Sequence, residues 1–224
     1  MDKFDIARSF GSASNTYDAH AGLQRSIGAS LLTANPKLCA GSAILDVGSG
    51  TGHFSRYLAD RYPLSRVVSL DISEGMLRAH AAGGLGSLHP IVGDAERLPL
   101  ASGVVDFVFS NLAIQWCSSQ SKAISEFFRV LKPKGILRFS TFGQGTLKEL
   151  RSAWHEVDSY SHVNDFEAFE ALSREVSRIG FQQVSLEQGF VSVPYSDPVS
   201  LMRELKGIGA HNLSENRPRH LTGK

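Results

Sequence analysis

Residues 43–52 read AILDVGSGTG, a short apolar run that leads into three glycines at alternate positions. The apolar run over 43–47 is entered through Gly41 and left through Gly48, which predicts a buried strand. Apolar residues at helical spacing over 54–62 predict a helix directly afterwards. Glycines in such a strand-to-helix turn permit positive φ angles and let a ligand approach the backbone closely. The stretch therefore predicts an α/β fold with a ligand site at the turn.

The same alternation of strand and helix continues along the chain. Further strands are predicted at residues 66–70, 88–92, 104–109 and 136–142. Helices are predicted from the N-cap Ser73 onward and over 123–131, where Pro133 ends the helix. Strands that are apolar nearly throughout and alternate with helices indicate a mostly parallel sheet covered on both faces. Because ligands bind beyond the carboxyl ends of such strands, the candidate functional residues are those that follow each strand: Gly48–Gly52, Asp71, Asp94 and Asn111.

Two regions flank this predicted core. Before it, residues 4–33 read as helical segments separated around 11–15. After it, helices are predicted over 147–158, 166–179 and 199–206, and a sixth strand over 184–193.

Composition excludes several classes of protein. A chain of 224 residues with 42% hydrophobic residues can form one domain with its own core. A net charge of +1 argues against a nucleic-acid protein that binds by neutralising phosphates. Cys39 and Cys117 are the only cysteines, and the eight histidines form no HxH or HxxxH pair, so neither a disulfide framework nor a metal site is expected. No signal peptide or membrane-spanning run is apparent, so we expect a cytoplasmic protein without membrane partners.

Asp71 narrows the ligand of the glycine turn. It ends the second predicted strand, 23 residues after Gly48, where a carboxylate can accept hydrogen bonds from ribose hydroxyls. A nucleoside-containing cofactor is therefore expected. A dinucleotide is disfavoured because His53 stands where that fingerprint needs a very small residue, and a P-loop is excluded because no Gly-Lys-Ser/Thr follows the turn.

The stretch Asp46–Gly52 resembles motif I of the class I S-adenosylmethionine-dependent methyltransferases. The resemblance continues at Asp71, at Gly93–Ala95 and at Leu131–Gly135. It implies a Rossmann-like sheet and S-adenosylmethionine as the cofactor, with Asp71 on the ribose and Asp94 on the adenine amino group. The cofactor-binding residues that it implies are Asp46, Gly48, Ser49, Gly50, Gly52, Asp71, Ile72, Asp94, Ala95 and Asn111.

The methyl acceptor can be constrained by what the sequence lacks. An amine or hydroxyl acceptor needs a general base near the cofactor. The sequence has no Asn-Pro-Pro-Tyr type motif and no histidine directly after the fourth predicted strand. A carboxylate needs no base, since at a pKa near 4 only about one molecule in a thousand is protonated at neutral pH. A carboxyl methyltransferase is therefore favoured.

Three stretches outside the general motifs, at 10–25, 110–117 and 205–210, are similar to the malonyl-acyl carrier protein O-methyltransferases of biotin synthesis. That resemblance implies methylation of the free carboxylate of malonyl-acyl carrier protein, or of malonyl-CoA, to start pimeloyl assembly. It also implies one domain over 1–224, in which a helical lid (1–40) and a cofactor-binding core (41–145) precede acceptor-side helices and a sixth strand (146–224). Positioning of the acceptor falls to Tyr17, Gln115 and Trp116, and substrate binding to Tyr17, His20, Gln24, Arg203 and Lys206.

The last part of the chain carries two further expectations. Residues 203–224 hold five Lys or Arg against two Glu, which predicts a docking surface for an acidic carrier protein, with an ordinary solvated face as the alternative. The family's sheet normally closes with an antiparallel seventh strand, and no alternating apolar run follows Lys206 to supply it, so the chain looks short.

Alternatives to this function stay open at the level of sequence. The acceptor could be another small carboxylic acid or a quinone precursor, and the chain could bind S-adenosylmethionine without catalysing a reaction.

Overall fold

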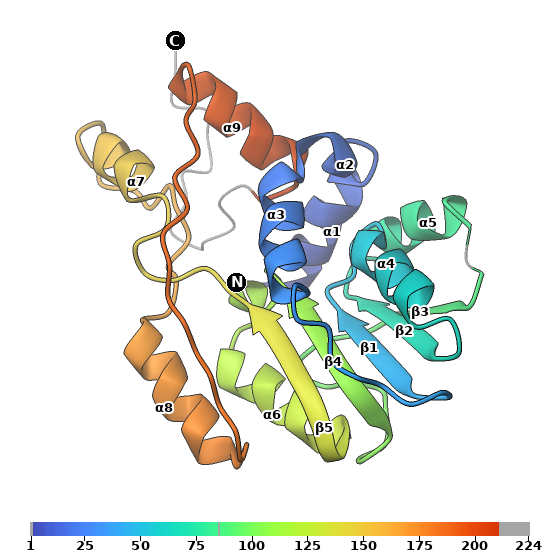
Figure 1. Cartoon of the computed structure of the whole chain (residues 1–224). Helices are drawn as coiled ribbons and strands as arrows, with labels where there is room; N and C mark the ends of the chain where they lie inside the picture. Colours follow the sequence, from blue (N-terminus) through green and yellow to red (C-terminus); the bar gives the residue numbers. More distant parts are fainter. Residues whose placement is uncertain (1, 85, 211–224) are drawn as a thin grey trace.

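A parallel sheet of five strands forms the centre of the structure, a computed structural model that describes residues 2–84 and 86–210. Its strands are β1 (Ala43–Val47), β2 (Arg66–Asp71), β3 (Leu88–Val92), β4 (Val105–Asn111) and β5 (Leu131–Ser140). They lie in the order β3-β2-β1-β4-β5 (Figure 1). The chain reverses its direction of travel across the sheet between β1 and β4, and ligands of such sheets bind at this point. The predicted parallel α/β architecture is confirmed.

Helices occupy the connections and both ends of the described chain. They are α1 (Lys3–Ala13), α2 (Tyr17–His20), α3 (Gly22–Leu31), α4 (His53–Arg61), α5 (Glu74–Ala82), α6 (Gln120–Val130), α7 (Lys148–His155), α8 (Phe169–Ile179) and α9 (Pro198–Gly207), with a short 3₁₀ turn η1 (Ile114–Trp116). Ser73 caps α5, because its hydroxyl accepts a hydrogen bond from the backbone N–H of Met76 at 3.4 Å. The predicted N-cap is therefore confirmed.

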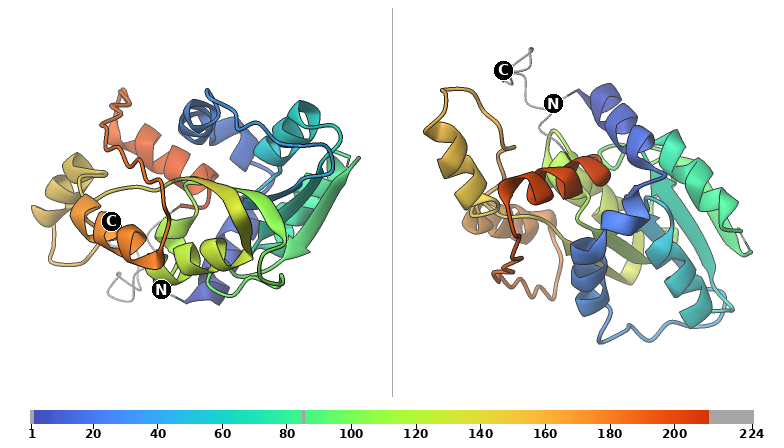
Figure 2. Two further views of the ribbon diagram at one scale, coloured as in Figure 1. Left: turned by 60° about the horizontal axis from the view of Figure 1, so that its bottom comes forward. Right: turned by 90° about the horizontal axis from the view of Figure 1, so that it is seen from above.

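The two faces of the sheet are buried against different helices. Ile44 and Phe107 pack on one face with Leu58 of α4. Leu45 and Val108, their neighbours in sequence, pack on the other face with α6 and α8. Figure 2 shows the helices on either side of the sheet. Since side chains alternate along a strand, apolar residues at successive positions are what a sheet covered on both faces requires.

The N-terminal helices lie over the end of the sheet at which the β1 turn is found, and α9 lies beside them (Figure 1). Two hydrogen bonds join α1 and its following turn to the end of α9. Ser9 Oγ donates to the carbonyl of Gly209 and Thr16 Oγ1 to that of Gly207, each at 2.8 Å. Segments almost 200 residues apart in sequence thus close the structure above the sheet.

The predicted sixth strand over 184–193 is wrong. This segment forms no strand, and the described residues contain no further strand beside β5 with which it could pair. Most of its apolar side chains are exposed, with Phe190 86% and Val191 65% exposed, although Leu186 packs against the core cluster formed with α6 and α8. An alternating apolar pattern gives a strand only where a neighbouring strand pairs with it, and none of the described strands pairs with this segment.

Two predicted boundaries also move. The fifth strand begins at Leu131, not at 136, because Leu131 pairs with Val105 before an irregularity in which Lys134 adopts φ 67°. The predicted separation around 11–15 is found over 14–16, since α1 continues through Gly11 to Ala13 and α2 begins at Tyr17. A Cβ on Gly11 would lie 3.1 Å from Ser73 Oγ. Gly11 therefore marks a close contact between α1 and the start of α5 and not a helix break.

Candidate functional site

The glycine turn after β1 is held close to two other strand ends. Gly48 has φ 73°, and a Cβ there would lie 2.3 Å from the Cβ of Ala113, so only glycine fits. The N–H groups of Gly48 and Ser49 both donate to the carbonyl of Leu70 in β2, at 2.8 and 3.0 Å. The turn is thereby fixed between the ends of β2 and β4.

Asp71 lies across this turn at the end of β2. It is buried, and its two carboxylate oxygens accept hydrogen bonds from the backbone N–H groups of Gly50 and Ser73, each at 2.8 Å. Burial raises the pKa of Asp71, although these backbone hydrogen bonds act in the opposite direction. Each oxygen retains lone-pair capacity. The carboxylate is thus rigidly placed and can still accept hydrogen bonds from a diol.

Asp46, the acidic residue that opens the motif, is buried beneath the turn. Its carboxylate accepts a hydrogen bond of 2.6 Å from Ser55 Oγ in α4. Burial raises the pKa of Asp46 to about 7, with Ser55 lowering it and the charge of Asp71 raising it. Its protonation is therefore sensitive to pH near neutrality.

A pocket lies between the glycine turn and the helices α2 and α3. Its lining residues are Tyr17, Asp18, Ala21, Gln24, Arg25, Asp46, Gly48, Ser49, Thr51, His53, Phe54 and Asn111. The ring of Tyr17 lies over Gly50, 3.9 Å from the position that a Cβ would take there. Burial and the charges of Asp71 and Asp18 raise the pKa of Tyr17, so its hydroxyl stays protonated. Tyr17, Gln24, Asp46, Gly48, Ser49 and Asn111, all expected at the site from sequence, meet in this pocket.

Two lining residues that sequence reasoning did not single out, Asp18 and Arg25, connect the lid to Thr51, which lies within the predicted stretch Gly48–Gly52. Thr51 Oγ1 donates to Asp18 Oδ1 at 2.8 Å, and Arg25 Nη2 donates to the same oxygen at 3.0 Å. Asp18 thus links α2, α3 and the glycine turn. The sequence signal for Asp18 and Arg25 was their position beside Tyr17 and Gln24, within the stretch at 10–25.

The pocket contains buried polar atoms that lack partners among the described residues. Ser49 Oγ and Gln24 Oε1 are both buried and without a hydrogen bond. An unsatisfied buried polar atom costs about 1–3 kcal/mol, so such atoms are expected where a polar ligand binds. Together with the Asp71 carboxylate, they fit the hydroxyl, amino and carboxylate groups of S-adenosylmethionine.

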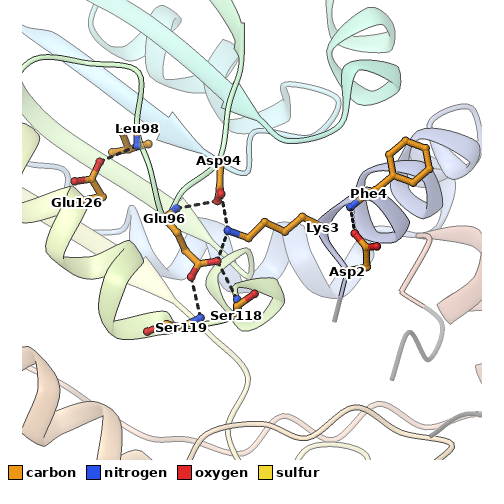
Figure 3. Close-up of polar contacts among 9 residues, drawn as sticks. All are labelled: Asp2, Lys3, Phe4, Asp94, Glu96, Leu98, Ser118, Ser119 and Glu126. Carbon is orange, nitrogen blue, oxygen red and sulfur yellow. Dashed lines mark hydrogen bonds and ion pairs between the residues drawn. The ribbon is translucent and has the colours of Figure 1, made fainter. Parts of the chain in front are cut away.

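The acidic loop after β3, which carries Asp94 and Glu96, is not part of the lining of this pocket. Asp94 Oδ2 accepts a hydrogen bond from Lys3 Nζ at 2.5 Å, and Asp94 Oδ1 accepts one from the N–H of Glu96 at 2.9 Å (Figure 3). Because β2 and β3 pair in parallel with Asp71 opposite Val92, Asp94 follows β3 at the edge of the sheet that carries Asp71. Ile72 and Ala95, also expected at the cofactor, follow the same two strands.

The residues expected to position the acceptor are less accessible. Gln115 is buried, and its side-chain N–H donates to the carbonyl of Leu112 at 2.7 Å while its oxygen accepts from Thr141 at 3.4 Å. Trp116 packs edge-on against Phe10 of α1, with ring centroids 5.1 Å apart. Both polar ends of the Gln115 side chain are therefore hydrogen-bonded within the fold. Trp116 packs against α1, the first helix of the lid.

Asn111 connects the lid to the strand ends. Its amide N–H donates to the carbonyl of Gln24 at 2.9 Å, and its oxygen accepts from Ser140 Oγ at 2.8 Å. The position of α3 over the pocket is therefore fixed by a residue at the end of β4.

A second hollow opens on the other side of α2 and α3. It is lined by Ala19, His20, Gly22, Leu23, Ser26, Val191, Val193 and Glu204. His20 packs against the end of α9, since a Cβ on Gly207 would lie 2.3 Å from its ring. Arg203 and Lys206 are exposed on α9 on either side of Glu204. His20 and Glu204 thus line this groove, apart from Tyr17 and Gln24, whereas Arg203 and Lys206 are exposed on α9 and are not among the lining residues. The rest of the predicted basic segment, 211–224, lies outside the described residues.

Among residues 2–84 and 86–210, no three histidine, cysteine or acidic side chains are placed to share a metal ion. None of the helices in this part of the chain combines the length and the apolar character needed to cross a membrane.

Comparison with known proteins places this geometry in a family. A family model described as a methyltransferase domain matches residues 45–139. A malonyl-acyl carrier protein O-methyltransferase of Methylococcus capsulatus is 48% identical over 98% of this chain and 81% of the relative. The biotin biosynthesis bifunctional protein BioHC of Cellvibrio japonicus is 42% identical over the whole of this chain and 44% of the relative.

Among solved structures, phosphoethanolamine N-methyltransferase 2 of Haemonchus contortus, in complex with S-adenosyl-L-methionine, superposes with a TM-score of 0.62. It is 21% identical, over 76% of this chain and 41% of that chain. At this identity the similarity shows the fold alone. The sequence relatives decide the family: the chain belongs to the malonyl-acyl carrier protein O-methyltransferases, within the class I S-adenosylmethionine-dependent methyltransferases.

Proposed function

We propose that this chain transfers the methyl group of S-adenosylmethionine to the free carboxylate of malonyl-acyl carrier protein, a step in biotin synthesis. The observation that carries the proposal is the pocket between the glycine turn and the lid, with its unpartnered Ser49 and Gln24 oxygens, in a chain 48% identical to a relative of that name. When bound, the cofactor supplies an electrophilic methyl group on a sulfonium centre. We expect the protein to act in the cytoplasm.

The chain's own residues divide the work of holding the cofactor. The glycine turn from Gly48 to Gly52 leaves room for a ligand against the backbone, and Asp71 offers its carboxylate to the ribose hydroxyls. Asp94 offers a second carboxylate for the adenine amino group. Tyr17 and Gln24 cover the pocket from the lid, where they would exclude water and orient the acceptor. Precise alignment is the main demand of an in-line displacement, and these rigid contacts meet it.

The titratable groups of the pocket leave one candidate for a general base. The phenol of Tyr17 is held protonated, and Asp46 and Asp71 are engaged in hydrogen bonds. Burial and the charge of Arg25 lower the pKa of His53, so this imidazole is neutral at physiological pH. It is the one histidine among the pocket's lining residues. A carboxylate acceptor would not need it as a base, because a carboxylate is ionised at neutral pH.

Replacing His53 tests this point. His53→Ala should change kcat for malonyl-acyl carrier protein by less than about 3-fold, whereas loss of a general base typically costs about 100- to 10,000-fold. His53→Gln serves as the matched control for the volume of the ring. A loss of kcat on the larger scale in both variants would assign His53 as a base and would favour an amine, hydroxyl or carbon acceptor.

The groove beside α9 supports a carrier-bound acceptor. It combines the apolar side chains of Leu23, Val191 and Val193 with the polar groups of His20 and Glu204, a mixture that suits a flexible arm with methyl and amide groups. Arg203 and Lys206 are exposed on α9, the helix that supplies Glu204 to the groove. Exposed positive charge accelerates association with an acidic protein even when the net charge is only +1.

The acceptor is tested by offering labelled S-adenosylmethionine with malonyl-acyl carrier protein, malonyl-CoA, free malonate and acetyl-acyl carrier protein. We expect label on both malonyl thioesters, fastest on the carrier, and none on the acetyl carrier, which lacks a free carboxylate. Equal labelling of malonyl and acetyl carriers would contradict a carboxylate acceptor. Labelling of free malonate alone would contradict a carrier-bound acceptor.

A further inference from the structure

A compact ion cluster joins the first turn of α1 to the acidic loop after β3. Lys3 Nζ lies 2.5 Å from Asp94 Oδ2 and 2.6 Å from Glu96 Oε2 (Figure 3). The Glu96 side chain is only 6% exposed, so one ammonium group pairs with a nearly buried carboxylate and with its neighbour. Burial lowers the pKa of Lys3, but the hydrogen bonds and charges of the two carboxylates outweigh it and raise the pKa overall. Lys3 is therefore charged at neutral pH.

Glu96 is fixed from its other side by the loop that precedes α6. Its carboxylate accepts hydrogen bonds from the N–H groups of Ser118 and Ser119, each at 3.0 Å. Leu98, two residues further on, donates its N–H to Glu126 of α6 at 2.8 Å (Figure 3). The acidic loop is thus anchored on α6 without any help from α1.

Asp94 has weaker support. Apart from Lys3, its carboxylate is held by the N–H of Glu96 at 2.9 Å. Without the ammonium group, the like charges of Asp94 and Glu96 would repel each other at close range, and repulsion of this kind is stronger where one partner is buried. Lys3 therefore decides where the Asp94 carboxylate points.

The attachment of α1 does not depend on this cluster alone. Ser9 Oγ donates to Gly209 at the end of α9, and Phe10 packs on Trp116. Gly11 lies against α5, where a Cβ on Gly75 would be 2.7 Å from the Gly11 Cα. Because these contacts hold the middle and end of α1, the helix does not need the Lys3 ion pairs to stay attached to the fold.

We propose that Lys3 is a positioning residue for the adenine end of the cofactor: it orients the Asp94 carboxylate so that its free lone pairs accept the exocyclic amino group. The inference rests on the proposed function, which places adenine at Asp94. A carboxylate only accepts hydrogen bonds. An oriented carboxylate therefore favours a purine with an amino group at C6 and opposes one with a carbonyl there.

The test measures binding and needs no turnover. Calorimetry compares S-adenosylhomocysteine with its 6-oxo counterpart, S-inosylhomocysteine. The wild type should prefer the amino ligand by about 10- to 100-fold, as expected for a hydrogen bond to a charged acceptor. Lys3→Met should reduce this preference to about 3-fold or less while leaving affinity for the oxo ligand nearly unchanged, and Lys3→Arg should restore most of it. Arg8→Met, which removes an exposed ion pair from the same helix, is the matched control and should keep the full preference.

The possible results distinguish the role of Lys3 from the binding of adenine at Asp94. If Lys3→Met weakens both ligands equally and the preference remains, Lys3 only anchors α1 and the proposal is overturned. Asp94→Asn tests the underlying assignment and should abolish the preference. If the wild type shows no preference, or Asp94→Asn keeps it, adenine does not bind at Asp94 and the role of Lys3 fails as well. Methyl transfer to malonyl-acyl carrier protein is measured independently and would stand in either case.

Discussion

The proposed cofactor side and the proposed acceptor side of the molecule are built in different ways. On the cofactor side, Asp71 and Asp46 are buried at strand ends, and each is fixed by hydrogen bonds of 2.6–2.8 Å. On the acceptor side, Arg203 and Lys206 project from α9, and the segment 184–193 that passes nearby is extended and exposed. A site formed by the ends of adjacent strands is rigid before any ligand arrives, whereas a site formed by surface helices depends on its partner.

The helices α2 and α3 separate the two sides. One face carries Tyr17 and Gln24 into the pocket over the glycine turn, and the other carries His20 and Leu23 into the groove beside α9. The comparison therefore predicts that substitutions on the two faces of one short lid have separable effects on cofactor and acceptor.

The largest effect is expected at the centre of the cofactor side. Asp71→Ala should weaken S-adenosylmethionine binding by about 100-fold or more, because it removes the ribose acceptor and leaves two backbone N–H groups without partners. Asp71→Asn keeps the side-chain volume and should still weaken binding about 10-fold. Calorimetry measures both, with the exposed Asp165→Ala as control. A folded Asp71→Ala variant with wild-type affinity would remove Asp71 from the site.

The second prediction concerns the buried proton on the cofactor side. The pKa of Asp46 is about 7 in the folded protein and near 4 in an unfolded chain. The folded state therefore holds an extra proton between about pH 4 and 7. The contribution of Asp46 to the free energy of unfolding is full below about pH 4 and is lost as the pH rises to about 7. In the wild type, deprotonation of Asp46 should lower the free energy of unfolding by about 2 kcal/mol between about pH 5 and 8. Asp46→Asn cannot titrate and should lack this part of the decrease.

Denaturant unfolding of wild type and Asp46→Asn at the two pH values measures this effect. An exposed carboxylate, Glu74→Gln, is the control and should leave the pH dependence unchanged. An identical pH dependence in wild type and Asp46→Asn would show that Asp46 is ionised across the whole range.

The third prediction separates the two faces of the lid. Asp18→Ala removes the link from α2 to Thr51 and should weaken cofactor binding by about 5-fold, with little change in KM for the malonyl carrier. His20→Ala, on the other face, should raise that KM by a similar factor and leave the cofactor Kd unchanged. Calorimetry and steady-state kinetics on both variants check the split. Parallel changes in both quantities would mean that the lid acts as one unit.

The smallest effect is expected at the surface of α9. Lys206→Glu should lower kcat/KM for malonyl-acyl carrier protein about 3-fold at low salt, and the defect should disappear at about 0.5 M salt, where charges are screened beyond a few ångströms. Lys148→Glu on α7 makes the same charge change at another exposed lysine and should have little effect. A Lys206→Glu defect that is independent of salt would exclude electrostatic docking at this position.

The sequence predicted the cofactor side well because its signals are local. The turn at 48–52, the strand that ends on Asp71 and the Ser73 cap each lie within a few residues of the pattern that indicates them. Contacts between residues far apart in the sequence could not be predicted from local patterns. Nothing near Lys3 in the sequence indicates that it meets Asp94, 91 positions away, or that Asp18 meets Thr51.

The acceptor side shows the opposite limit. The alternation over 184–193 is typical of a strand, but pairing depends on a neighbouring strand that a local pattern cannot supply. Gln115 and Trp116 follow β4 as expected, yet their burial and contacts are decided by Thr141 and Phe10 from other parts of the chain. For the segment 184–193 and for Gln115 and Trp116, the sequence indicated which part of the chain mattered. Their structure and contacts depend on tertiary packing, which a local pattern does not show.

The central claim is that the rigid cofactor side serves methylation of a carrier-bound carboxylate. The most direct measurement is the intact mass of malonyl-acyl carrier protein after incubation with this protein and S-adenosylmethionine. We predict a mass gain of one CH₂ group that depends on S-adenosylmethionine and is absent with acetyl-acyl carrier protein, which has no free carboxylate to methylate. An unchanged carrier mass in the presence of protein that binds S-adenosylmethionine by calorimetry would contradict the account.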